Sequence, residues 1–201
     1  MNDIIVPGDM AYDQPHRFEG SFVEGGKTFV SVVSARYGDK IVALKGKYKP
    51  LVGDYVVGIV SEQKFAGYNV DLNSPYIGLI SSRETRESFE LGDVVSCVIR
   101  SVDEVNEALL VEPRKLSGGR LVEIESVKVP RVIGRNSSMV SMLEQYTQSK
   151  IFVGKNGRIY LKDGNVPLTI LAILKISHEA HLQGLTDRMK AYLEQESAKP
   201  K

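Results

Sequence analysis

The sequence predicts a multidomain, mainly β protein with a C-terminal α+β domain. Two observations lead to this prediction. Short apolar runs separated by glycine turns occupy the chain as far as Val111, whereas helical periodicity begins only after the stretch 113–119. This change of period marks a domain boundary. We therefore expect a β domain over residues 1–52, a second β domain over 53–117, an α+β domain over 118–185 and a flexible polar tail over 186–201.

The first 52 residues alternate apolar and polar side chains in short runs. The runs are Ser21–Val23, Thr28–Val32 and Lys40–Leu44, and glycine turns at residues 25–26 and 38–39 separate them. Alternation bounded by glycine turns predicts a small all-β domain.

Residues 53–117 contain five further apolar runs of strand length. They are Tyr55–Val60, Tyr68–Leu72, Tyr76–Ile80, Asp93–Ile99 and Ala108–Val111. Five strands at this spacing predict an OB barrel. Cys97, the one cysteine of the chain, lies in an apolar run. It is expected to be a buried thiol. A single cysteine excludes a disulfide framework and fits a reducing cytoplasm.

The second and third strands of an OB fold present its ligand face. Phe65, Tyr68 and Tyr76 are therefore candidates for stacking on bases. Lys64, Arg83 and Arg86 are candidates for contacts with phosphate. Each of the three aromatics could instead lie in the barrel core. For Tyr68 this second interpretation has a specific reason, because alternation places it beside the apolar residues Val70 and Leu72.

The third region follows the order strand, helix, helix, strand, strand, helix. The expected elements are Leu121–Glu125, Val127–Ile133, Ser138–Gln148, Ile151–Val153, Arg158–Leu161 and a long helix capped by Asn165 that runs past Leu182. Leu168, Leu171, Leu174 and Leu182 are expected to cover the sheet. This order is typical of a KH-type RNA-binding domain, and Gly134-Arg135-Asn136-Ser137 stands where such a domain places its backbone-clamping G-x-x-G turn.

Charge supports an RNA contact in this third region. Residues 118–185 hold 9 Lys and Arg against 5 Asp and Glu, a balance of +4, whereas residues 1–117 hold 13 against 17, a balance of −4. Arg131, Arg135, Lys155 and Arg158 are expected to cluster.

The turn from Gly134 has Ser137 where the second glycine would stand, so side chains would replace some backbone contacts. Arg135, Asn136, Ser137 and Ser138 could bind phosphate together with the amides that open the second helix. Alternatively, Ser137 or Ser138 caps that helix. Lys155 and Asn156 lie in a Gly-Lys-Asn-Gly turn, which hairpin geometry alone also explains.

The chain resembles the cap subunit of the archaeal RNA exosome, which joins an N-terminal β domain, an S-one-type OB domain and a KH domain. The resemblance rests on residues 6–9 (VPGD), on Gly53-Asp54 followed by 70–76 (VDLNSPY), and on 129–161. It implies a non-catalytic protein that binds single-stranded RNA and sits in three copies on a hexameric ring of phosphorolytic subunits, guiding RNA into the ring.

Enzyme chemistry is not expected. Gly20 and Gly26-Lys27-Thr28 miss the spacing of a phosphate-binding loop by one residue, and His178 and His181 are three rather than four positions apart, unlike the zinc protease helix. We expect no cofactor, no metal, and no membrane segment, since no apolar stretch approaches ~20 residues.

Two alternatives to the exosome cap remain open. One is a free-standing RNA-binding factor associated with translation or ribosomes, and the other is a structural clamp whose RNA surfaces are vestigial. The first domain favours a ring subunit, because an RNA reader does not need it. Its apolar residues either contact the ring or fill the core of the small domain: Ile4, Ile5, Val6, Phe18 and Phe22.

Overall fold

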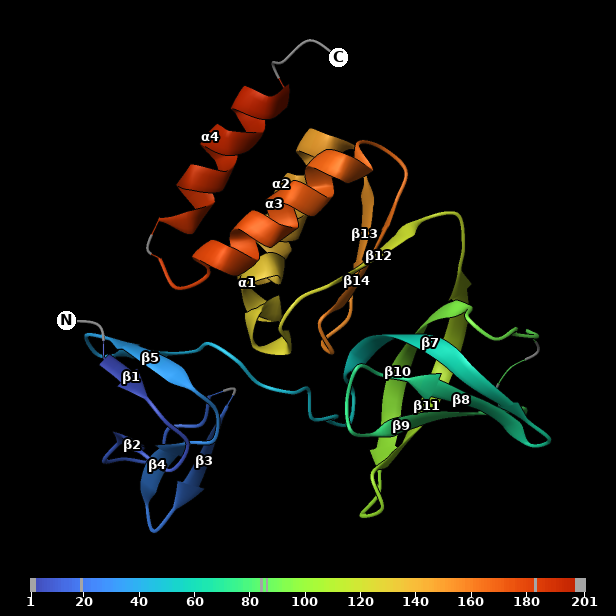
Figure 1. Cartoon of the computed structure of the whole chain (residues 1–201), viewed down its shortest axis with the longest axis horizontal. Helices are drawn as coiled ribbons and strands as arrows, with labels where there is room; N and C mark the ends of the chain where they lie inside the picture. The colour runs from blue at the N-terminus through green and yellow to red at the C-terminus, as the bar shows by residue number, and fades with distance from the viewer. Residues whose placement is uncertain (1–2, 19, 84, 86, 183, 198–201) are drawn as a thin grey trace.

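The computed structural model describes residues 3–197 except 19, 84, 86 and 183. Figure 1 shows a small β unit at the N-terminus, a barrel, and a helical domain that lies above both in this view. The predicted class, mainly β with a C-terminal α+β domain, is confirmed.

The N-terminal domain consists of two three-stranded antiparallel sheets in the part of the chain that is described. One has the order β1 (Asp3–Ile5), β5 (Ser34–Tyr37), β6 (Lys40–Ala43), and the other β2 (Met10–Tyr12), β4 (Lys27–Val30), β3 (Ser21–Glu24). Ile5, Ala11 and Val30 form a small core, against which Phe18 packs. Of the five apolar candidates for a partner contact, Ile5 and Phe18 thus fill the core, and Ile4, Val6 and Phe22 are exposed.

The second domain is a closed barrel with the strand order β10-β11-β9-β8-β7. Its strands are β7 (Tyr55–Lys64), β8 (Gly67–Asp71), β9 (Ile77–Ser81), β10 (Val94–Val102) and β11 (Glu107–Leu116). The strands β9 and β11 are parallel and the other neighbours antiparallel. The predicted OB barrel is confirmed.

The barrel core is apolar, and inward side chains such as Val56, Val70 and Leu110 are fully buried. Cys97 is buried within it, and burial raises the pKa of its thiol to about 12. A thiol with that pKa carries almost no thiolate at neutral pH, which fits the expected inert cysteine.

Two predicted boundaries of the barrel domain shift. Tyr48 belongs to the barrel core, and its hydroxyl donates to Asp54 Oδ2 at 2.7 Å, so the domain begins before Gly53. At the other end, β11 continues through Pro113 to Leu116, because the pairing with β10 has a bulge between Val111 and Arg114, where a proline without an N–H is tolerated. The linker is therefore shorter than the predicted stretch 113–119.

The third domain has the predicted order of elements. A three-stranded sheet, β12-β14-β13, is covered by helices, and their shared core includes Val129, Leu143, Ile159 and Ile173. The elements are β12 (Arg120–Glu123), a 3-10 turn at Ser126–Lys128, α1 (Val129–Ile133), a 3-10 turn at Arg135–Ser137, α2 (Ser138–Thr147), β13 (Lys150–Val153), β14 (Arg158–Lys162), α3 (Val166–Glu179) and α4 (Leu185–Ser197). Asn165 caps α3 as predicted, since its Oδ1 accepts from Leu168 N at 3.1 Å.

The prediction of a flexible tail over 186–201 is wrong for residues 186–197. These residues form most of α4, whose Leu185, Met189 and Leu193 are buried in the domain core. Spacing of four residues places these three side chains on one helical face, and that face packs against α2 and α3. Residues 198–201 lie outside the described residues.

The predicted helix running past Leu182 ends at Glu179, and a second helix, α4, begins at Leu185. The predicted buried face of the first of these helices is partly wrong. The buried face of α3 carries Leu168, Ala172, Ile173 and Ile176. Leu171 and Leu174 lie on the opposite side of the same helix and are exposed, and Leu182, in the turn that follows, is also exposed.

Candidate nucleic-acid interface

The turn between α1 and α2 is shaped by its backbone. Gly134 has φ 74°, and a Cβ there would lie 2.7 Å from Met139 N, so only glycine fits. Asn136 and Ser137 are both left-handed, with φ of 51° and 60°. Ser137 occupies the N-cap position of α2 without a side-chain capping bond, so its hydroxyl is not engaged in a cap.

This turn presents polar groups to solvent. Arg135, Asn136, Ser137 and Ser138 are exposed, as is Arg131 on the preceding helix. The turn also opens α2, and the first turn of that helix carries no acidic residue, so its amide dipoles are not neutralised. A guanidinium, hydroxyls and a helix N-terminus on one loop form a surface that suits a phosphate group.

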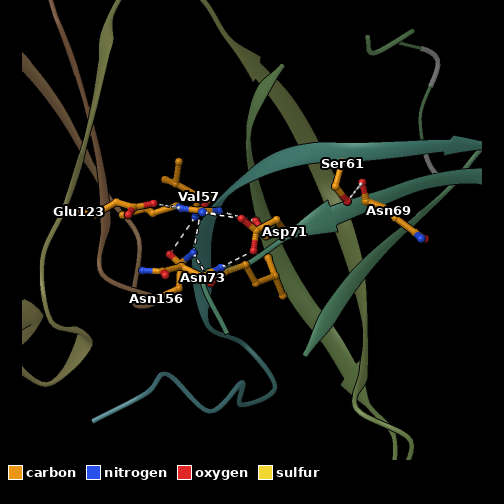
Figure 2. A network of polar contacts seen from close by, with 9 residues as sticks. Val57, Ser61, Asn69, Asp71, Asn73, Glu123 and Asn156 are labelled. Carbon is orange, nitrogen blue, oxygen red and sulfur yellow. Dashed lines mark hydrogen bonds and ion pairs between the residues drawn. The ribbon is translucent and has the colours of Figure 1, made fainter. Parts of the chain in front are cut away.

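The second candidate turn, Gly154 to Gly157, faces the barrel instead of solvent. Gly157 N donates to Gly154 O at 3.2 Å, which closes the turn between β13 and β14. Asn156 is buried, and its Oδ1 accepts from Val57 N at 3.2 Å while its Nδ2 donates to the carbonyl oxygens of Val57 and Leu72 at 2.7 and 3.0 Å (Figure 2). Asn156 thus satisfies three backbone groups of the barrel.

The backbone of the same turn adds a further contact. Lys155 N donates to Tyr55 O at 2.8 Å. A Cβ at Gly154 would lie 2.7 Å from Val57 N, so the approach of the two domains at this point requires glycine. The Lys155 side chain itself remains exposed.

Arg158 lies in the same interface and is also buried. Its Nε donates to Glu123 Oε1 at 2.8 Å and its Nη2 contacts Asp71 Oδ2 at 2.6 Å, while Nη1 donates to Asp71 O. Burial raises the pKa of Asp71, but bonds from Arg158 and from Asn73 N, together with the charge of Arg158, outweigh it and lower the pKa overall.

These contacts correct the predicted roles of Asn156 and Arg158. Both were expected to bind RNA, but both are buried. Their side chains instead form hydrogen bonds that join the KH domain to the barrel. We refer to Asn156, Arg158, Asp71 and Glu123 as the interdomain clamp. No local pattern around Asn156 and Arg158 predicts this clamp, because their partners on β7 and β8 lie 99 and 87 positions away in the chain.

On the barrel, the candidate residues separate into exposed and packed. Phe65 is fully exposed at the β7–β8 turn, Lys64 beside it is half exposed, and Arg83 is exposed. Tyr76, just before β9, is partly buried, and Arg86 lies outside the described residues. The β7–β8 turn projects on the side of the barrel away from the KH helices (Figure 1).

Tyr68 follows the second of its two interpretations. Its ring packs edge-on against Phe89 with centroids 5.2 Å apart, and its hydroxyl accepts from Phe89 N at 3.3 Å. It is partly buried and supports one side of the barrel core, with both its ring and its hydroxyl in contact with Phe89.

Within the described part of the chain, no group of three or more His, Cys, Asp and Glu side chains could hold a metal ion. None of the helices in the same residues is long and apolar enough to cross a membrane.

An OB barrel joined to a KH domain, with an exposed aromatic turn on one and a basic turn on the other, defines a class of single-stranded nucleic-acid-binding proteins. No family model matches the chain. Individual proteins do match it along most of its length, as do solved structures.

Three curated relatives carry the name exosome complex component Rrp4. The protein from Methanosarcina mazei is 38% identical over 218 residues, covering 98% of this chain and 84% of its own. Those from Pyrococcus furiosus and Methanopyrus kandleri are 35% and 36% identical, covering 95% and 94% of this chain and 82% and 92% of their own. A crystal structure described as a "putative exosome complex RNA-binding protein" superposes with a TM-score of 0.69 at 33% identity, covering 75% of this chain and 97% of that one. The chain belongs to the Rrp4 family of exosome components.

Proposed function

We propose that this chain is the RNA-binding cap subunit of an archaeal exosome, which binds single-stranded RNA and guides it to a phosphorolytic ring. The observation that carries the proposal is the exposed turn from Gly134 to Ser138, where basic and hydroxyl side chains surround the opening of α2. The names of the relatives, as exosome components, support the same assignment.

The proposed RNA surface has two parts. On the KH domain it comprises Arg131, Gly134, Arg135, Asn136, Ser137, Ser138 and the side chain of Lys155. On the barrel it comprises Lys64, Phe65, Tyr76 and Arg83, with Phe65 as the stacking residue. Stacking and phosphate contacts tolerate many sequences, which suits a subunit that serves RNA degradation.

The proposed docking surface is the N-terminal domain. Ile4 and Val6 are 68% and 51% exposed, and Phe22 is 40% exposed while it stacks on Phe29. Such large apolar side chains on a small domain mark a protein contact. In this proposal three copies sit on a hexameric ring of phosphorolytic subunits in the cytoplasm, and the chain itself is not catalytic.

Co-purification from the native cell extract with subunit mass analysis tests the proposal. We expect phosphorolytic ring subunits at equal stoichiometry with this chain, and no RNA loss when the purified chain alone is given RNA with phosphate or divalent metal. Recovery of the chain alone or with ribosomes would overturn the exosome assignment in favour of a free-standing RNA-binding factor.

A matched pair of variants separates the two surfaces. The double variant Ile4→Ser with Phe22→Ser should lose ring association and keep RNA binding. The variant Arg135→Gln should keep ring association and bind RNA about 5- to 10-fold more weakly. If either variant lost both properties, the two surfaces would not be separate and the docking assignment would fail.

A further inference from the structure

The outer face of β7 and β8 carries a buried polar side chain with an unusual environment. Val70 points into the barrel core, so the alternation of β8 places Asn69 on the outer face, next to Glu62 across the strand pair. Asn69 is nevertheless only 7% exposed. Figure 2 shows its carboxamide pointing away from the interdomain clamp.

Only half of this carboxamide is bonded. Asn69 Nδ2 donates to Glu62 Oε2 at 2.7 Å. Asn69 Oδ1 is buried and has no hydrogen-bond partner among the residues that the structure describes. A buried acceptor without a partner is costly, and native proteins rarely keep one unless water or a ligand satisfies it.

Glu62 determines which end of the amide is free. An ionised carboxylate can only accept hydrogen bonds, so the amide nitrogen must face it and the carbonyl oxygen must face away. The free group is therefore an acceptor, which a donor from a bound ligand or a water molecule can satisfy.

The position of this acceptor suits a base. It lies on the second strand of the barrel, one of the two that form the ligand face of an OB fold, on the strand pair whose turn carries Phe65. The neighbouring Glu62 and Lys64 side chains are 57% and 51% exposed and can move aside for a bound nucleotide. Among the bases, cytosine and adenine present an exocyclic amino group with two N–H donors, whereas the one donor of uracil, N3–H, lies between the acceptors O2 and O4, which would face Asn69 Oδ1 unfavourably.

We propose that Asn69 is a specificity-determining residue, whose Oδ1 accepts a hydrogen bond from the exocyclic amino group of cytosine or adenine and so disfavours uracil. The proposal rests on the proposed RNA-binding function and adds a base preference to it. Glu62 is a positioning residue, which acts only by fixing the orientation of the Asn69 amide.

The test compares binding of oligocytidylate and oligouridylate of equal length to the full chain, at a slightly alkaline pH and fixed salt. The two pyrimidines have rings of the same size, so the ratio of their affinities reports the amino group rather than stacking area. We expect the wild-type chain to bind oligocytidylate roughly 5- to 10-fold more tightly, a ratio that a single neutral hydrogen bond can produce.

The decisive variant is Glu62→Gln. A glutamine offers both a donor and an acceptor, so the Asn69 amide can rotate and face the ligand with either end. The ratio of affinities should fall toward one, while both affinities rise or stay equal because a negative charge near Lys64 is removed. Glu24→Gln, which removes the same charge from the N-terminal domain, should leave the ratio unchanged.

Asn69→Leu provides an independent readout. Replacing a half-bonded amide by an apolar group of similar size should leave the melting temperature unchanged or higher, while the preference is lost. Equal binding of both oligonucleotides by the wild-type chain, or an unchanged ratio in Glu62→Gln, would overturn the role of Asn69 and leave RNA binding intact. Absence of binding to either oligonucleotide would instead overturn the proposed function.

Discussion

The KH domain contains two polar turns of similar composition that behave in opposite ways. Gly134 to Ser138 holds a basic residue, an asparagine and two serines that all face solvent. Gly154 to Gly157 holds a basic residue and an asparagine as well, but its asparagine is 1% exposed and bonded to the barrel. Composition alone therefore does not distinguish a turn that can meet a ligand from a turn that holds two domains together.

The difference has a physical origin in the partner of each turn. Residues Val57 and Leu72 present outward backbone groups that need hydrogen bonds once the KH domain covers them, and Asn156 supplies those bonds. The side chains at positions 135–138 are instead exposed. The polar atoms of the clamp are thus bonded within the chain, whereas the polar side chains of the turn from Gly134 face solvent.

The largest effect that would test this comparison is expected for Asn156→Ala. Three buried backbone groups of the barrel would lose their partner, so the free energy of unfolding should fall by about 2–4 kcal/mol. Chemical denaturation followed by circular dichroism measures it. Asn136→Gly, which removes the same side chain from the exposed turn and tolerates the left-handed backbone there, should change stability by less than about 0.5 kcal/mol. Equal losses in both variants would contradict the comparison.

Arg158→Met should have the next largest effect. The variant keeps most of the apolar stem but loses charge-assisted bonds to Asp71 and Glu123. Because both carboxylates are about half exposed and can hydrate, the expected loss is about 2–3 kcal/mol of unfolding free energy. Arg131→Met, at an exposed site, serves as the control. A stability unchanged by Arg158→Met would show that the clamp does not hold the domains together.

Arg135→Gln should act on binding and not on stability. Losing one phosphate contact should weaken RNA affinity about 5- to 10-fold and reduce the slope of log affinity against log salt by about one. Fluorescence anisotropy over a salt series measures both. A weaker affinity with an unchanged slope would mean that Arg135 does not contact phosphate.

The smallest expected effect is the loss of the Asp71 contribution to the free energy of unfolding at acid pH. The pKa of Asp71 in the folded chain lies below its ordinary value of 3.8, so its stabilising contribution is complete above that value and is lost as pH falls through the lower, folded pKa. The difference in unfolding free energy between wild type and Asp71→Asn should therefore shrink from about pH 4 downward. Urea denaturation at neutral and acid pH measures it, and a constant difference would exclude the ion pair as its source.

Much of the fold could be predicted because it depends on local pattern. Alternation located the strands of the barrel, and the Asn165 cap followed by Pro167 located the start of α3. The helix α4 was missed because its polar average resembles a disordered tail, although Leu185, Met189 and Leu193 recur at intervals of four.

The candidate site was harder to predict because burial is not local. Asn156 bonds to Val57, which lies 99 positions away in the sequence, and the residues around Asn156 do not predict that contact. Tyr68 had two interpretations for the same reason, since Phe89, which packs against it, comes from a later loop. Phe65 also had two interpretations in the sequence, and only its position in the β7–β8 turn of the structure places it outside the core.

The interdomain clamp also has a consequence for how a long transcript is held. Asn156 and Arg158 bond to β7 and β8, and these bonds hold the turn at Phe65 and the turn at Arg135 at a fixed separation. If both turns bind RNA as proposed, a transcript long enough to span them makes its second contact intramolecularly, at a high effective concentration, whereas a shorter transcript makes a single contact. In the proposed function, the affinity for RNA would therefore depend on transcript length as well as on sequence.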